Sequence, residues 1–199
     1  MNPSVKYAPP ALLLIACVLA IHRCQRRMGA HERPEVSLYE GLGEAAAAEV
    51  NAVAGGDGPW FVVAVESSEH PRFAAMVDSF KDAVSGKVIW HFLPGEKVLG
   101  FQNDGWGISQ LREAVGDQSG IKGLVLLGGS FRPGGRADGS PPPVLVAGPV
   151  PRDVAQSALA ERQLSVAIVY KDSPGYSPGA SPEDQFKASF EILRAPETP

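Results

Sequence analysis

Five apolar stretches, separated by segments of helical character, constrain the fold of this chain more than any other feature. The first, Trp-Phe-Val-Val-Ala-Val at 60–65, is continuous and rich in valine, which is typical of a β-strand buried on both faces. Four further stretches of this kind occupy residues 87–93, 121–129, 143–149 and 164–170. Strands that alternate with helices indicate a parallel sheet with right-handed crossovers and helices on both faces.

Helical spacing follows the first of these stretches. After Pro71, which suits the first turn of a helix, apolar residues recur on one helix face at Phe73, Met76, Val77, Phe80 and Val84. Gly86 lies where such a helix would end. Further helices are predicted over 108–115, 152–163 and 181–194.

The last predicted helix, 181–194, has the clearest start signals. Ser181 suits the N-cap and Pro182 the first helical position, and acidic residues follow near the positive end of the helix dipole. Its expected buried stripe consists of Phe186, Phe190 and Leu193.

Together these patterns predict an α/β fold with three layers. We expect an open, mostly parallel, five-stranded sheet with helices on both faces, as in a single Rossmann-like lobe, preceded by an N-terminal hydrophobic helix. The link 130–143 breaks the alternation, because its Pro and Gly residues exclude a helix. This link is either a flexible lid or a place where the strand assignment fails.

The apolar segment at 7–21 is about 15 residues long, which is shorter than the ~20 residues that a membrane-spanning helix needs. It fits a cleaved signal peptide, a short uncleaved anchor or a lipoprotein signal, since Leu-Ile-Ala-Cys at 14–17 resembles a bacterial lipobox. Arg23, Arg26 and Arg27 follow it, and positive charge prefers the cytoplasmic side. We expect membrane association on the extracytoplasmic side, with the cytoplasmic side left open.

Three regions follow from these boundaries. Residues 1–27 form the signal peptide or membrane anchor, and residues 28–58 form a tether. A short surface helix is expected within this tether, at 41–53, because the sequence there contains good helix formers and only a weak apolar stripe. Residues 59–199 form the α/β domain.

Charge and cysteine content exclude several classes of function. A net charge of −4 gives no electrostatic footprint for nucleic acid. The two cysteines, Cys17 and Cys24, both lie in the N-terminal region, so the domain has neither a disulfide framework nor a thiolate metal site. The four histidines show no metal-ligand spacing. No cofactor or metal is therefore predicted.

Ligands of open α/β sheets bind beyond the carboxyl ends of the strands. The polar and aromatic residues expected there are Ser67, Ser68, Glu69, His70, Arg72, Trp106, Ser130, Arg132, Arg152 and Asp172. Free N–H groups at the helix start near Pro71 suit an anion or a polar oxygen, and the Trp106 ring suits stacking on a sugar. Helix capping alone also explains the Ser and His residues before Pro71. No G-x-S-x-G motif is present, so no catalytic residue is predicted.

Residues 60–172 resemble one lobe of the type I periplasmic sugar-binding proteins and the related lac-repressor-like ligand-binding domains. The resemblance lies in FVVAVESSEHPRFAAMVDSFKDAV, LREAVGDQSGIKGLVLLGG and PVLVAGPVPRDVAQSALAERQLSVAIVYKDSP. It implies a non-catalytic domain that binds a small polar, sugar-like ligand or a partner protein. Because that family binds its ligand between two lobes and this chain has room for one, a structural or interaction module with a degenerate crevice is the alternative.

Overall fold

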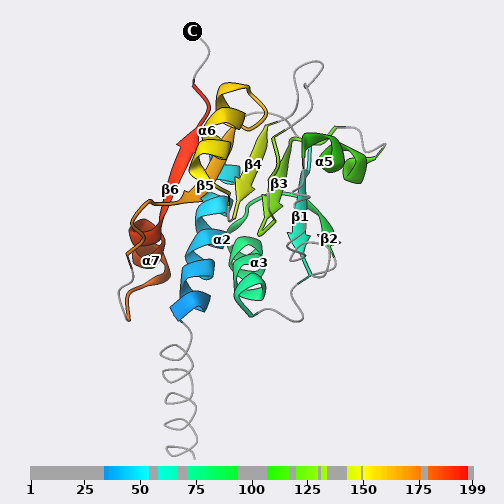
Figure 1. Ribbon diagram of the computed structural model, residues 1–199. Coiled ribbons are helices and arrows are strands. Elements are labelled where there is room, and N and C mark those ends of the chain that lie inside the picture. Colours follow the sequence, from blue (N-terminus) through cyan, green and yellow to red (C-terminus); the bar gives the residue numbers. More distant parts are fainter. Residues whose placement is uncertain are drawn as a thin grey trace, which may run out of the picture. The chain divides into compact units, whose positions relative to one another are not determined.

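The computed structural model describes residues 34–53, 58–66, 71–93, 107–116, 120–129, 131–133, 143–148, 150–175 and 179–196 (Figure 1). Glu35–Pro199 form one compact unit. The apolar segment at 7–21 lies outside the described residues, as does most of the link between 130 and 143. No helix within the described part of the chain combines the length and the apolar character needed to span a bilayer.

A six-stranded sheet forms the centre of this unit. Its strands are, in spatial order, β2 (Val88–Leu93), β1 (Trp60–Val65), β3 (Gly123–Leu127), β4 (Val144–Ala147), β5 (Val166–Tyr170) and β6 (Phe190–Arg194). The first five strands are parallel to their neighbours, and β6 pairs antiparallel with β5. The predicted α/β class with a mostly parallel sheet is therefore confirmed, with six strands instead of five.

Helices cover both faces of the sheet. On one face the buried cluster combines Val62 and Ala64 of β1 with side chains from α2 (Pro34–Ala52), α3 (Pro71–Ala83) and α7 (Pro182–Ser189). On the other face Phe61 and Val63 pack with α5 (Ile108–Val115) and α6 (Arg152–Ala160). From Trp60 to Ala64, successive residues of β1 thus enter opposite layers, as the period of a strand requires, and this explains why its sequence is continuously apolar.

The prediction of one helix over 181–194 is wrong in its second half. Helix α7 begins as expected, since the Ser181 hydroxyl accepts a hydrogen bond from the Asp184 N–H at 3.2 Å, but it ends at Ser189. Strand β6 then begins at Phe190. Phe190 and Ile192 face the α2 layer while Leu193 packs on the α6 layer, so the residues from Phe190 onward have the period of a strand.

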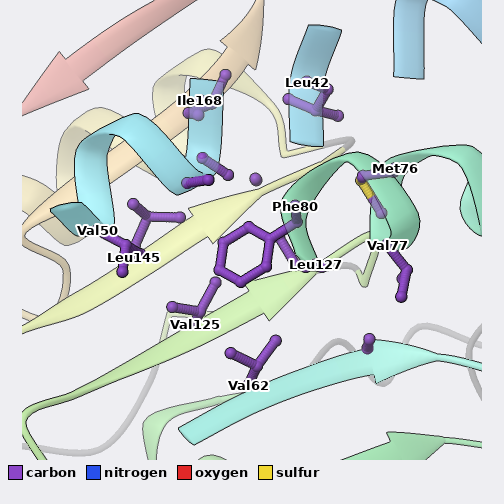
Figure 2. Packing of buried hydrophobic residues seen from close by; sticks show 14 of the residues in the cluster. Leu42, Val50, Val62, Met76, Val77, Phe80, Val125, Leu127, Leu145 and Ile168 are labelled. Atoms are coloured by element: carbon purple, nitrogen blue, oxygen red, sulfur yellow. The ribbon is translucent and has the colours of Figure 1, made fainter. Parts of the chain in front are cut away.

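Helix α2 is longer than the surface helix expected at 41–53, and it is part of the core. Leu42, Ala46 and Val50 are buried, and Figure 2 shows Leu42 and Val50 in the same cluster as Phe80 of α3. Small residues permit this approach. A Cβ atom on Gly43 would lie 2.2 Å from the Met76 carbonyl oxygen, and one on Gly41 would lie 2.2 Å from the Pro182 carbonyl oxygen. Helix α2 therefore contacts the backbone of both α3 and α7.

Candidate functional site

The order of the strands identifies where a crevice can form at the carboxyl edge of the sheet. From β1 the chain proceeds through α3 to β2 on one side, whereas from β3 it proceeds to β4 on the other side. Neighbouring strands whose connections diverge leave a crevice between their carboxyl ends, and ligands of doubly wound sheets bind there. The candidate site is therefore the edge formed by the residues that follow β1 and β3, which we call the carboxyl rim.

The described residues that come directly after these two strands are Glu66 after β1 and two glycines after β3. Glu66 is exposed, and its N–H donates a hydrogen bond to the Leu93 carbonyl at 2.7 Å, so the backbone here remains tied to β2. Gly128 has a φ of 79°, which favours glycine, and a Cβ atom on it would lie 2.9 Å from both Phe73 and Met76. The requirement for glycine at 128 thus arises both from this backbone conformation and from α3, whose side chains fill the space beside it.

Backbone also meets backbone at the end of β4. A Cβ atom on Gly148 would lie 3.3 Å from the Gly128 Cα atom, and the Gly128 N–H donates to the Ala147 carbonyl at 2.8 Å. The carboxyl ends of β3 and β4 are therefore closely packed and present main-chain atoms. A ligand at this end of the sheet would meet N–H and C=O groups between the two strands, while side chains would have to come from the loops.

The start of α5 lies beside the segment that follows β3. Gly107 precedes the helix, and its N–H donates to the Gln110 Oε1 atom at 2.6 Å. A Cβ atom on Gly107 would lie 3.4 Å from the Arg132 carbonyl oxygen, while Phe131 is buried among the residues of α5 and α6. Phe131 thus fixes the start of the 130–143 link on the sheet, and the exposed Arg132 follows it at the rim.

Two of the predicted site residues, Arg152 and Asp172, lie in direct contact. Arg152 begins α6, and its Nη1 atom lies 3.0 Å from the Asp172 Oδ2 atom and 3.2 Å from the Glu191 Oε1 atom. Its Nη2 atom donates to Glu191 Oε2 at 3.3 Å. The guanidinium of Arg152 therefore forms ion pairs with two carboxylates. An anionic ligand would have to displace these carboxylates before it could bind Arg152.

Arg72 contacts aromatic rings of the helical layer. Its guanidinium carbon lies 5.7 Å from the centre of the Tyr39 ring on α2 and 5.2 Å from that of Phe73 on α3. These are distances at which a cation is attracted to the face of a ring. The two rings meet edge to face at 5.6 Å, so Arg72 covers the junction of α2 and α3.

Six of the ten predicted site residues lie outside the described residues, and they therefore remain predictions. They are Ser67, Ser68, Glu69, His70, Trp106 and Ser130. Of the other four, the structure brings Arg152 and Asp172 together, whereas Arg72 lies at the junction of α2 and α3 and Arg132 follows Phe131.

Glu191 contacts Arg152 but is not among the predicted site residues. The sequence predicts a helix over 181–194 that includes Glu191, whereas the residue lies in β6, which directs it toward Arg152 of α6. The signal that could have revealed it is the alternation of Phe190, Glu191, Ile192 and Leu193, which fits a strand with one face on each layer.

Two ionisable groups outside the predicted set have shifted pKa values. Burial, together with the neighbouring Glu44, raises the pKa of Glu40 above its ordinary value of 4.5. The hydrogen bond to Glu183 raises the pKa of Lys187 above 10.5.

Within the described ranges, no group of three or more His, Cys, Asp or Glu residues could hold a metal ion. A comparison with known protein families and with curated sequences finds no match to this chain.

Proposed function

We propose that the chain is a membrane-associated, non-catalytic binding domain whose ligand, a small polar and sugar-like molecule or a segment of a partner protein, binds at the carboxyl rim. The observation that carries this proposal is the divergence of the chain after β1 and β3. The predicted ligand-binding residues at 67–70 and Ser130 belong to the two segments that diverge there. Polar residues on loops that a rigid sheet positions are the usual means of binding in such folds.

Two features of the sequence support the rest of the proposal. The resemblance of residues 60–172 to one lobe of type I periplasmic sugar-binding proteins favours a sugar-like ligand. The apolar segment at 7–21 favours attachment to a membrane, with the domain on the extracytoplasmic side. Measuring the mass of the mature N-terminus would distinguish cleavage, lipidation at Cys17 and retention of the segment.

A thermal-shift screen of the full chain against sugars and small anions tests ligand binding. A true ligand raises the melting temperature with increasing concentration, because it binds only the folded state. The Glu69→Ala and Ser130→Ala variants should lose this shift. Glu113→Ala is the matched control, since Glu113 is exposed in the last turn of α5, the end of that helix that leads toward the start of β3. A shift that all variants retain would place the ligand elsewhere.

A structural or interaction module with a degenerate crevice is the second candidate function. The engagement of Arg152 by Asp172 and Glu191, and of Arg72 by two rings, favours it, because both arginines then stabilise the fold itself. Affinity capture with the full chain separates the two candidates. A partner that is still captured by the Glu69→Ala and Arg132→Ala variants supports the interaction module, and loss of that partner supports binding at the carboxyl rim.

A further inference from the structure

Strand β2 forms one edge of the sheet, and within the described ranges no strand pairs with its outer side (Figure 1). All six of its residues pair with β1, from Val88 opposite Trp60 to Leu93 opposite Val65. An edge strand presents a row of N–H and C=O groups that a further strand can bind. The chemistry of β2 therefore determines what can be added to the sheet at this edge.

The backbone groups that point outward belong to alternate residues. The carbonyls of Lys87 and Leu93 accept hydrogen bonds from β1, at 2.9 and 2.7 Å. Because the N–H and C=O of one residue point to the same side and this side alternates along a strand, Val88, Trp90 and Phe92 direct their backbone groups away from β1. Three donors and three acceptors are thus evenly spaced around Trp90.

Aromatic side chains accompany these outward backbone groups. The rings of Trp90 and Phe92 stack with their centres 5.5 Å apart and an interplanar angle of 6°. Phe92 is 43% exposed, and it is the one large hydrophobic side chain of the described residues that is classed as exposed. The Lys81 ammonium lies over these rings, 5.2 Å from the Trp90 ring centre and 5.7 Å from that of Phe92, and Phe92 nevertheless remains exposed.

The strand carries no Lys, Arg, Asp or Glu between Val88 and Leu93. Charged residues on an edge strand are a common means by which proteins prevent the addition of another strand. The opposite edge strand, β6, has both Glu191 and Arg194. A copy of β2 meeting β2 would therefore bring no like charges together within the strand, and this makes the edge compatible with itself.

We propose that β2 pairs with β2 of a second copy of this chain, antiparallel and centred on Trp90. In this register Trp90 lies opposite Trp90, and Val88 of each copy lies opposite Phe92 of the other. All three pairs are of the hydrogen-bonded type, so every outward N–H and C=O of Val88, Trp90 and Phe92 obtains a partner. Opposite residues point to the same face, and the aromatic residues of both copies therefore form one row.

The area available indicates a weak dimer. A stable specific interface buries about 1,000 Å² or more, whereas a fully covered aromatic side chain contributes about 150–250 Å². Trp90 and Phe92 already contact each other and Lys81, so the two copies together add only part of that area. The paired backbone groups supply the specificity, and we expect dimers at high protein concentration or where attachment to a membrane concentrates the chain.

Cysteine cross-linking tests the register in the full chain, with Cys17 and Cys24 changed to serine. When Trp90 is central, position 89 of one copy lies opposite position 91 of the other in a non-hydrogen-bonded pair, about 4.5 Å apart between Cα atoms, which suits a disulfide. The Ile89→Cys/His91→Cys double variant should therefore form a covalent dimer on oxidation, and neither single variant should. A dimer formed by His91→Cys alone would overturn the register centred on Trp90.

Sedimentation equilibrium in detergent solution, which shields the apolar segment at 7–21, tests the dimer without altering buried side chains. Phe92→Lys should weaken association by about tenfold or more, because it places two charges in the row of rings. Ala160→Lys, at an exposed position of α6, is the matched control and should leave association unchanged. Wild-type monomers at every concentration would overturn the proposal. If the backbone amides of Trp90 and Phe92 were then protected from hydrogen exchange, another segment of the same chain would occupy the edge.

Discussion

The two edges of the sheet differ in how their outermost strands contact the rest of the fold. At one edge, β6 leaves α7 directly, and its charged residues are paired: Glu191 with Arg152 of α6, and Arg194 with Glu49 of α2. At the other edge, β2 has an exposed phenylalanine and no acidic or basic residue, and Lys81 of α3 lies over its rings. Both strands pack on helices of both layers, yet among the described residues only β6 also forms ion pairs with a helix on each face.

This difference follows how the chain reaches each edge, since β2 and β6 both lack a described strand on their outer side. The parallel strand β2 is reached by a crossover through α3. The antiparallel β6 instead follows a helix that packs beside it, so Phe186 of α7 stacks on Phe190 at 5.6 Å. Substitutions that compare matched residues of the two edges test how far their contributions to stability differ.

Truncation of a phenylalanine should have the largest effect, and it should differ strongly between the edges. Phe190 is 2% exposed and contacts Phe186 and Tyr170, so Phe190→Ala should reduce the free energy of unfolding by about 3–5 kcal/mol. Phe92→Ala removes a ring that is already 43% exposed and should cost about 1 kcal/mol. Urea denaturation of the two variants measures both values, and equal losses would contradict the distinction between the edges.

The Arg152 cluster should contribute the next largest effect, chiefly through its less exposed carboxylate. Glu191 is 24% exposed and binds both terminal nitrogens of Arg152, so Glu191→Ala should reduce stability by about 1–2 kcal/mol. Asp172 is 80% exposed, and Asp172→Ala should cost about 0.5 kcal/mol or less. Denaturation midpoints of the two variants would show whether the stabilising contact of Arg152 is chiefly the one with Glu191 of β6 or the one with Asp172, which follows β5.

The ion pair between Glu49 and Arg194 should have a smaller and salt-dependent effect. Arg194 donates to both carboxylate oxygens of Glu49, with its Nε atom 3.1 Å from Oε2. A double-mutant cycle with Glu49→Ala and Arg194→Ala should give a coupling energy of about 0.5–1 kcal/mol at low salt. The coupling should decrease in 1 M salt. If it did not, packing of the aliphatic parts would be the better explanation of the contact.

Glu40, on the same helix as Glu49, should have the smallest effect and the opposite sign. Its pKa in the folded protein is raised above 4.5, so the folded state is penalised at pH values above that raised pKa, and the penalty disappears as the pH falls below 4.5. Glu40→Gln should therefore stabilise the protein at neutral pH, by less than about 0.5 kcal/mol because the carboxyl is only partly buried. Melting temperatures at pH 4 and pH 7 measure the difference, which should vanish at the lower pH.

The sequence predicted the parallel part of the sheet well, because buried parallel strands carry a simple signal. The first stretch, 60–65, coincides with β1, and each of the other four stretches contains one of the strands β2 to β5. Pro71 and Gly86 also lie where the sequence placed them, at the start of α3 and just beyond its end. Apolar runs bounded by glycine and proline are sufficient to locate such elements.

The sequence did not predict the elements whose structure depends on contacts with distant parts of the chain. The strong start signals of α7 outweighed the short alternation from Phe190 to Leu193, and the end of the helix at Ser189 depends on the pairing of Phe190 with Tyr170 of a distant strand. The role of Gly41 and Gly43 was missed for the same reason, since a small residue in a helix has no apolar signal until its neighbour is known. At the candidate site, the sequence placed Arg152 and Asp172 at the same edge but did not reveal that Glu191 joins them.

The contact between Gly41 and Pro182 has a consequence for folding during synthesis on the ribosome. The first described helix packs on the last one, so residues separated by most of the domain must both be made before the contact can form. Helix α2 also packs on α3, which is made much earlier than α7, so only the α7 side of its packing depends on the C-terminal part of the chain. The complete burial of α2 therefore forms only after residues up to α7 have been synthesised, while its contact with α3 can form earlier.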